Sequence, residues 1–220
     1  MRKFLSIMIA ISGISFIVII HELGHLLAAK FFGVGAPSFS IGFGPEITGI
    51  QLGQTFYKIS LLPLGGYVLL NPVQLDAAPF ITQAIIILAG IAVNFLFTYG
   101  VLAWLSYRGL PYYDMLQTVV QGCGIRSSFV GPIGIISLIS YSATLGINYL
   151  LMILATISFS IGMFNLLPIP FLDGGQLVGF AYAALERSFP GNDYGNMLII
   201  ILLIVLVLYV VKRQVLRGAR

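Results

Sequence analysis

Residues 4–32 read FLSIMIAISGISFIVIIHELGHLLAAKFF. This stretch is long enough to cross the ~30 Å hydrocarbon core of a bilayer, because a membrane helix needs about 20 apolar residues. It contains both histidines of the 220-residue chain, within His21-Glu22-Leu23-Gly24-His25. Side chains four residues apart share one helix face, so both imidazoles can reach one metal ion. Burying two histidines and a glutamate in an apolar helix is costly without partners, which argues against a chance occurrence. The pattern predicts a zinc hydrolase site within a membrane span, with Glu22 as general base.

The composition favours a polytopic membrane protein. Hydrophobic residues make up 59% of the chain and charged residues only 8%, whereas a soluble domain averages about a quarter charged residues. The mean hydropathy is +1.03. The net charge of +4 does not indicate a nucleic-acid partner, because the basic residues are scattered or lie at span ends, where they anchor a helix at lipid headgroups.

Four apolar stretches predict membrane spans, at about residues 4–31, 80–106, 148–167 and 196–211. The start, Met1-Arg2-Lys3 followed by an apolar run, resembles a signal peptide, but no small-x-small cleavage site follows. We therefore expect a retained first span. Residues 131–147 are apolar but contain several serines and glycines, so an interfacial helix, a re-entrant helix and the first part of a longer third span all stay open.

The predicted fold is an α-helical polytopic membrane protein with about four transmembrane helices and a small membrane-associated β region between the first and second. We expect a single domain over residues 1–220. Its predicted parts are a first span with the histidine motif (1–33), the β region (34–72), a second span (80–106), a short loop (107–130), the segment 131–147, a third span (148–168), a loop with an acidic residue (169–195) and a fourth span (196–211).

The β region is rich in Gly, Ser, Phe, Tyr and Val. Residues 38–44, 55–60 and 65–70 are short β-prone runs separated by glycine and proline, which predict strands and turns. An open sheet edge cannot face lipid. We expect the region to lie at the interface, to dip into a protein-lined cavity, or to pair with another segment. A free edge can also bind an extended peptide as an added strand.

The third metal ligand must come from outside the histidine motif, because catalytic zinc sites usually take three protein ligands. Among seven acidic residues, Asp173 differs in its surroundings, since it follows the prolines of NLLPIPFL (residues 165–172) and precedes two glycines. The prolines restrict the backbone at the span end and the glycines permit a tight turn. That position could match the depth of the histidines. A helix N-cap is the alternative role for Asp173.

Two asparagines lie within or at the end of predicted spans. Asn94 is mid-span in GIAVN (residues 90–94), and Asn165 ends the third span. A buried amide can simply bridge two membrane helices. Alternatively, these side chains hydrogen-bond a bound peptide backbone or a developing oxyanion.

These motifs together resemble the site-2 proteases, a family of intramembrane zinc metalloproteases. The matching motifs are HELGH (21–25), GIAVN (90–94) and NLLPIPFLDGG (165–175). FSIGFG (39–44) and LPLGGYV (62–68) are similar to the membrane-associated β region of bacterial envelope-stress members, and GPI (131–133) also occurs there before the third span. Those members carry one or two PDZ domains between the second and third spans, whereas this chain has only residues 107–130 there, as in a compact form without PDZ domains.

The resemblance implies one zinc ion per chain, bound by His21, His25 and Asp173, with Glu22 as catalytic base. It implies that Asn94 and Asn165 contact the substrate and that the β region, at Gly65, Gly66 and Tyr67, binds it as an unwound strand. The implied substrate is a single-span membrane protein or a signal-peptide remnant, within the lipid bilayer of a bacterial cytoplasmic membrane.

Orientation and two other functions stay open. Four spans place both termini on one side, where most Lys and Arg lie, and the positive-inside rule puts that side in the cytoplasm. The resemblance implies the reverse, with the catalytic end facing the cytoplasm. A catalytically silent relative that binds membrane proteins is one alternative function. A small transporter with a metal site is another, although no repeat is visible.

Overall fold

The computed structural model describes residues 2–122 and 131–188, together with residues 190, 197, 201 and 205. Its elements are α1 (Arg2–Phe31), β1 (Ser38–Leu52), β2 (Thr55–Leu69), α2 (Pro72–Ala77), α3 (Phe80–Tyr107), α4 (Tyr112–Gly122), α5 (Pro132–Leu145), α6 (Ile147–Asn165) and α7 (Asp173–Ser188). Three helical segments are long and apolar enough to cross a bilayer, namely Ile7–Phe31, Phe80–Tyr107 and Ile147–Asn165. They confirm the first three predicted spans. The predicted fourth span, residues 196–211, falls outside the described residues except for 197, 201 and 205.

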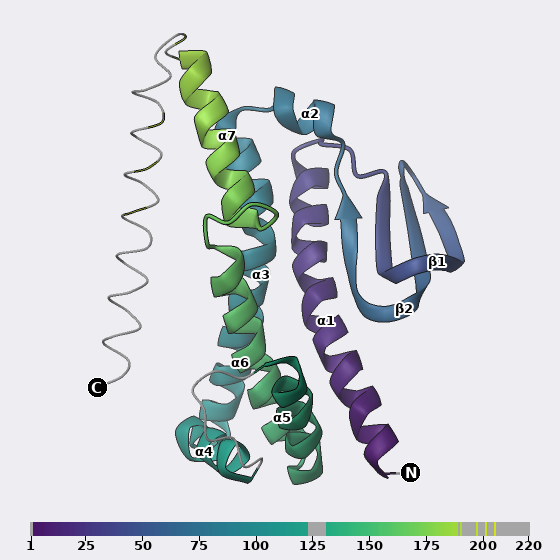
Figure 1. Cartoon of the computed structure of the whole chain (residues 1–220), viewed down its shortest axis with the longest axis vertical. Helices are drawn as coiled ribbons and strands as arrows, with labels where there is room; N and C mark the ends of the chain where they lie inside the picture. Colours follow the sequence, from purple (N-terminus) through teal and green to yellow (C-terminus); the bar gives the residue numbers. More distant parts are fainter. Residues whose placement is uncertain are drawn as a thin grey trace.

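Helix α1 lies between the β region and the other long helices (Figure 1). Helices α4 and α5 pack at the end where the N-terminus lies, and α2 lies at the opposite end. The largest buried cluster joins α1, α3, α4, α5 and α6 near the first of these ends, and includes Ile17, Leu105, Val119, Ile139 and Met152. The core therefore holds the bundle together at one end and leaves the middle of α1 for polar side chains.

Small residues let α1 and α3 approach closely. A Cβ atom added to Gly24 would lie 2.6 Å from the carbonyl oxygen of Ala89 and 3.0 Å from the Cα of Gly90. Such small-residue contacts are common between membrane helices, because they allow two backbones to touch. The contact places the histidine face of α1 directly against α3.

The predicted β region forms one sheet of two 15-residue strands, longer than the short runs predicted from the sequence. A two-residue turn joins them, and Gly53 takes the positive φ of +61° that such hairpin turns require. Irregularities in register bend both strands. As a result, Ser38 at the start of β1 lies opposite both Phe56 and Leu69 of β2. The bends, rather than chain breaks, accommodate the glycines and prolines of the sequence.

Two segments predicted as loops contain helices. Within residues 107–130, α4 forms over Tyr112–Gly122 and buries Met115 and Val119, while residues 123–130 lie outside the described part of the chain. Within residues 169–195, α7 forms over Asp173–Ser188 and packs against α3. Both connections between predicted spans thus contain a helix, which tertiary packing, rather than a long apolar period, stabilises.

Helix α5 occupies the segment whose role stayed open. Its 14 residues, Pro132–Leu145, extend about 21 Å at 1.5 Å per residue, which is short of a ~30 Å hydrocarbon core. It packs against α1 and α6, and α6 begins directly after Gly146. The segment is thus a separate short helix beside the third span, not part of one longer helix.

Candidate metal centre

Helix α1 presents His21 and His25 one turn apart on the same face. Each residue is 5% exposed, and the two rings meet edge to face with centroids 4.8 Å apart. Their Nε2 atoms are 3.1 Å apart. His21 lies ten residues before Phe31, the end of α1, which corresponds to about 15 Å along the helix. The spacing that predicted a shared target therefore brings two imidazole nitrogens together inside a membrane span.

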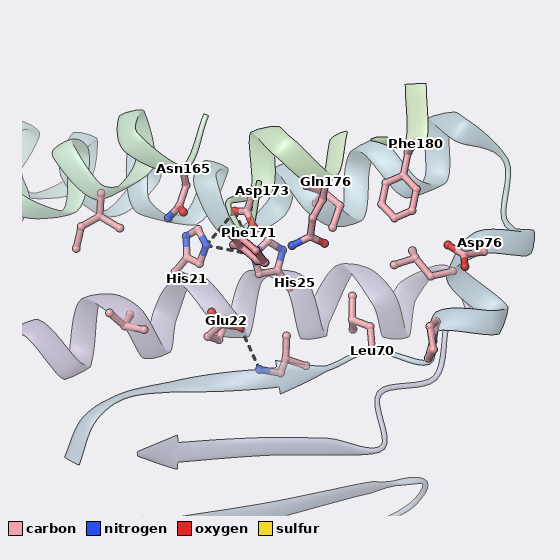
Figure 2. A pocket seen from close by; sticks show the side chains of 16 residues that line it. His21, Glu22, His25, Leu70, Asp76, Asn165, Phe171, Asp173, Gln176 and Phe180 are labelled. Carbon is pink, nitrogen blue, oxygen red and sulfur yellow. Dashed lines mark hydrogen bonds and ion pairs between the residues drawn. The ribbon is translucent and has the colours of Figure 1, made fainter. Parts of the chain in front are cut away.

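Asp173 reaches the same point from the start of α7. Its Oδ2 atom lies 3.0 Å from Nε2 of His21 and 3.4 Å from Nε2 of His25, and the residue is 8% exposed. Figure 2 shows the carboxylate above the two imidazoles, with Glu22 below His21 and toward β2. The potential ligand atoms of the three residues all lie within 4.8 Å of one another. Three residues from two separated sequence motifs thus form one compact group.

The glycines after Asp173 make room for the backbone that precedes it. A Cβ atom on Gly174 would lie 2.4 Å from the carbonyl oxygen of Leu166, and one on Gly175 would lie 2.1 Å from that of Ile169. Neither glycine has a positive φ. Their role is therefore close backbone approach, and not the tight turn that the sequence predicts.

The donor set fits a zinc ion. Two imidazole nitrogens and one carboxylate oxygen match the His₂-carboxylate ligands of catalytic zinc sites, which leave a fourth position open. Oδ2 of Asp173 is buried and has no well-formed hydrogen bond within the described residues, although two ring nitrogens lie beside it. A cation would satisfy this oxygen and both nitrogens together.

The electrostatic surroundings of Asp173 keep it ionised. Burial alone would raise the pKa of this carboxyl group, but its interactions with His21 and His25 outweigh burial and lower the pKa to about 2. An ionised carboxylate is the form that binds a metal ion. Asp173 is therefore ready to act as a ligand at any physiological pH.

Glu22 points toward the β region. Its Oε2 atom accepts a hydrogen bond of 3.0 Å from the backbone N–H of Val68 in β2 (Figure 2). A cavity of about 480 Å³ includes Glu22, the three candidate ligands, Asn165 and Gln176 in its lining. The candidate base therefore shares one cavity with the candidate metal site.

Serine 15 ties the sheet to α1 two turns before the histidines. Its hydroxyl donates to the carbonyl oxygen of Pro63 and accepts a 3.1 Å hydrogen bond from the N–H of Gly65. These contacts fix the end of β2 along α1, so that Val68 reaches Glu22. The sequence contains no signal for this contact, because Ser15 and Gly65 are 50 residues apart.

The predicted substrate residues lie in different places. Asn165 lines the cavity, whereas Asn94 is fully buried and is not part of its lining. The β region contributes Val68 and Leu70 to the lining rather than Gly65, Gly66 and Tyr67. Tyr67 instead stacks on Phe43 and lies under the ammonium group of Lys58.

Residues of α3 contact the Nδ1 atoms of both histidines. Nδ1 of His25 lies 2.9 Å from the carbonyl oxygen of Ile86, and Nδ1 of His21 lies 3.2 Å from Nδ2 of Asn94. Gly90, between these two positions, faces both rings, because an added Cβ atom would lie 2.4 Å from Nε2 of His25. Sequence reasoning missed these supporting roles, although the four-residue spacing of Ile86, Gly90 and Asn94 is the signal that could have indicated them.

Comparison with known proteins identifies similar sequences. The model of peptidase family M50 matches residues 9–209. A protein of Chlamydia trachomatis serovar D named "putative zinc metalloprotease" is 50% identical over 60 residues, which cover 27% of this chain and 10% of that protein. Proteins of the same description from Synechocystis sp. and Nostoc sp. are each 34% identical over 110 residues, 44% of this chain and 30% of each relative. The chain thus spans at most 30% of the length of these relatives.

Proposed function

This chain belongs to peptidase family M50, and from that premise we propose that it is a zinc-dependent endopeptidase of the site-2 type. Its proposed reaction is hydrolysis of a peptide bond in or near the transmembrane segment of a membrane-protein substrate. The carrying observation is the convergence of His21, His25 and Asp173 beside Glu22 within a helix apolar enough to span a bilayer. A soluble peptide substrate would not require a site at that depth.

One zinc ion per chain is proposed, held by His21, His25 and Asp173. These three residues are the one group of potential metal ligands within the described ranges. When bound, zinc supplies Lewis-acid chemistry, because it polarises a carbonyl oxygen and makes water more acidic. The ionised Asp173 would offset part of the positive charge that the cavity would then contain, and the two buried imidazoles would supply neutral nitrogen ligands.

Glu22 is the proposed general base. It takes a proton from the attacking water, the water oxygen bonds to the scissile carbonyl carbon, and the carbon–nitrogen bond breaks as Glu22 gives the proton to the leaving amine. The hydrogen bond from Val68 N–H to Oε2 holds the carboxylate at the cavity and leaves Oε1 for the proton. Such acid–base assistance is worth about 10²- to 10⁴-fold in rate.

The substrate is proposed to bind as an extended strand. One edge of β2 near its end is paired with β1, where Val68 lies opposite Phe39. On the other edge, the N–H of Val68 points to the cavity, where it bonds to Glu22. A free strand edge can pair with an extended peptide. A substrate helix must unwind to expose its carbonyl group. The proposed partners for the freed backbone groups are the amide of Asn165 and the backbone of β2 beside Val68, whose own N–H already bonds to Glu22.

The β sheet also suits a membrane setting. Ile47, Ile50, Leu61 and Leu64 are each more than half exposed, which is costly in water but favourable against lipid or an apolar substrate. We propose that the chain resides in the bacterial cytoplasmic membrane, and its bacterial relatives support this location. The proposed partner is a single-span protein or a signal-peptide remnant.

The test uses the full chain reconstituted in liposomes with a tagged single-span substrate. The wild type should release fragments, and Glu22→Gln should cleave at least ~100-fold more slowly while binding the same amount of zinc. The matched control is Glu46→Gln, because Glu46 is an exposed glutamate of β1. Cleavage by Glu22→Gln at the wild-type rate would refute the mechanism. Zinc and substrate binding without cleavage by the wild type would identify a catalytically silent relative instead.

A further inference from the structure

We propose that Asn94 is a positioning residue that accepts a hydrogen bond from Nδ1–H of His21 and thereby directs Nε2 of His21 to the metal. This inference rests on the proposed function for the identity of the metal, but concerns a residue outside the ligand set. It replaces the predicted role of Asn94 in substrate contact. A substrate in the cavity would not reach Asn94, because this side chain is fully buried and the cavity lining does not include it.

The contact between the two side chains is buried and direct. Nδ2 of Asn94 lies 3.2 Å from Nδ1 of His21. The other end of the amide, Oδ1, is buried and has no hydrogen-bond partner within the described residues. The amide therefore has an acceptor without a donor, next to a ring nitrogen that can carry a proton.

The second histidine shows the arrangement that a metal ligand needs. Nδ1 of His25 lies 2.9 Å from the backbone oxygen of Ile86. A carbonyl oxygen can only accept, so this ring nitrogen carries the proton and Nε2 keeps its lone pair. Metal-binding histidines commonly donate their other N–H to a carbonyl or carboxylate group in this way. Asn94 lies eight residues after Ile86, on the same face of α3, and meets the other ring.

The same reasoning assigns the proton of His21. Its Nε2 lies 3.0 Å from Oδ2 of Asp173 and 3.1 Å from Nε2 of His25, so this nitrogen must be unprotonated to bind a shared cation. Nδ1 then carries the proton and needs an acceptor. A half-turn of the Asn94 amide exchanges its oxygen and nitrogen and places Oδ1 at the 3.2 Å position. The half-turn gives the unpartnered oxygen a donor.

The backbone around Asn94 is held in place. Its carbonyl oxygen accepts hydrogen bonds from Thr98 Oγ1, at 2.9 Å, and from Ser158 Oγ of α6, at 3.2 Å. Gly162 of α6 lies beside it, because a Cβ atom there would lie 3.4 Å from Cβ of Asn94, an ordinary contact distance. The amide is thus fixed between α3 and α6, as expected of a group that orients a ligand.

Zinc affinity measured by competition with a chelator tests the role. Asn94→Leu has similar size but no acceptor, and should raise the zinc Kd by about 10- to 100-fold. Asn94→Asp retains an acceptor and should stay within about threefold of the wild type. Gln83→Leu is the matched control, because it removes another buried amide of α3 that bonds to Leu75 and is not itself part of the cavity lining. It should leave zinc affinity unchanged.

Nitrogen-15 labelling of histidine gives a second measurement, because the chain has only two histidines. In the zinc-bound wild type, both rings should be protonated at Nδ1 and metal-bound at Nε2. In Asn94→Leu, the His21 resonances should change and those of His25 should not. The wild-type spectrum tests the proposal even if Asn94→Leu does not fold.

Several results would overturn the proposal. These are protonation of His21 at Nε2 in the wild type, wild-type zinc affinity in Asn94→Leu, or equal losses in Asn94→Asp and Asn94→Leu. A wild type that binds zinc but cleaves no substrate would overturn only the proposed function. A wild type that binds no zinc would overturn both.

Discussion

The replacement of Gly90 by alanine should disrupt the metal centre without disturbing the fold. Gly90 lies on α3 directly behind the two imidazoles. An added Cβ atom would lie 2.4 Å from Nε2 of His25 and 2.9 Å from Cε1 of His21, whereas ordinary contacts begin near 3.4 Å. His25 must therefore move by about 1 Å, yet metal–ligand distances tolerate only about ±0.2 Å. We expect the zinc ion to lose one ligand.

The size of the effect follows from this displacement. Disturbing only the groups that orient a ligand typically costs 10- to 100-fold in metal affinity, so the loss of a ligand should cost at least about 100-fold, or ~2.7 kcal/mol. In contrast, alanine has a higher helix propensity than glycine by up to about 1 kcal/mol, so local helix stability should not fall. Zinc affinity and stability should therefore respond differently.

The assay measures zinc Kd by chelator competition and thermal unfolding of the metal-free protein in the same detergent. Gly100→Ala is the matched control, because Gly100 lies on the same helix and no described atom comes within 4 Å of its added Cβ. It should keep wild-type zinc affinity and cleavage. The reasoning would be refuted if Gly90→Ala bound zinc as tightly as Gly100→Ala and cleaved substrate at the wild-type rate.

Three further predictions concern Asp173, Ser15 and Phe171. Asp173→Asn should lower the zinc content measured by elemental analysis, and stoichiometric zinc in this variant would remove Asp173 from the ligand set. Ser15→Ala should lower the free energy of unfolding by about 1–2 kcal/mol, because two hydrogen bonds are lost, and should leave the zinc content unchanged. An unchanged melting temperature would contradict this prediction. Phe171→Gly should raise the free energy of unfolding by about 1 kcal/mol or leave it unchanged, because Phe171 has a φ of +76° and its side chain is 98% exposed. A clear fall in melting temperature would contradict this prediction.

Apolar length and motif spacing were enough to predict much of the fold and of the candidate site. The three described spans agree with the predicted ranges because about 20 apolar residues can satisfy their backbone only as a helix in lipid. His21 and His25 converge because helix periodicity alone places them on one face. The proline- and glycine-bounded Asp173 reaches the same centre from α7. Each of these features is local in sequence or depends on a separate, strong motif.

Other features required contacts between distant segments. Helices α4 and α7 lack long apolar periods and form where they pack against the bundle. The participation of Val68 in the cavity depends on Ser15, which fixes β2 along α1. The role of Asn94 depends on which atom of His21 faces it, and sequence spacing cannot distinguish that neighbour from a substrate.

The sequence by itself determined that the chain has helices long and apolar enough to cross a membrane, that two histidines share one face of the first, and that Glu22 lies between them. These conclusions follow from hydrophobicity and helical period, which are properties of neighbouring residues. Only the tertiary structure decided how close Asp173 lies to both imidazoles, that the edge of β2 meets Glu22, and that Ile86, Gly90 and Asn94 of α3 contact the histidines. The physical reason is that these contacts arise where packed backbones approach within a few ångströms, and that approach is decided by the packing of the whole bundle.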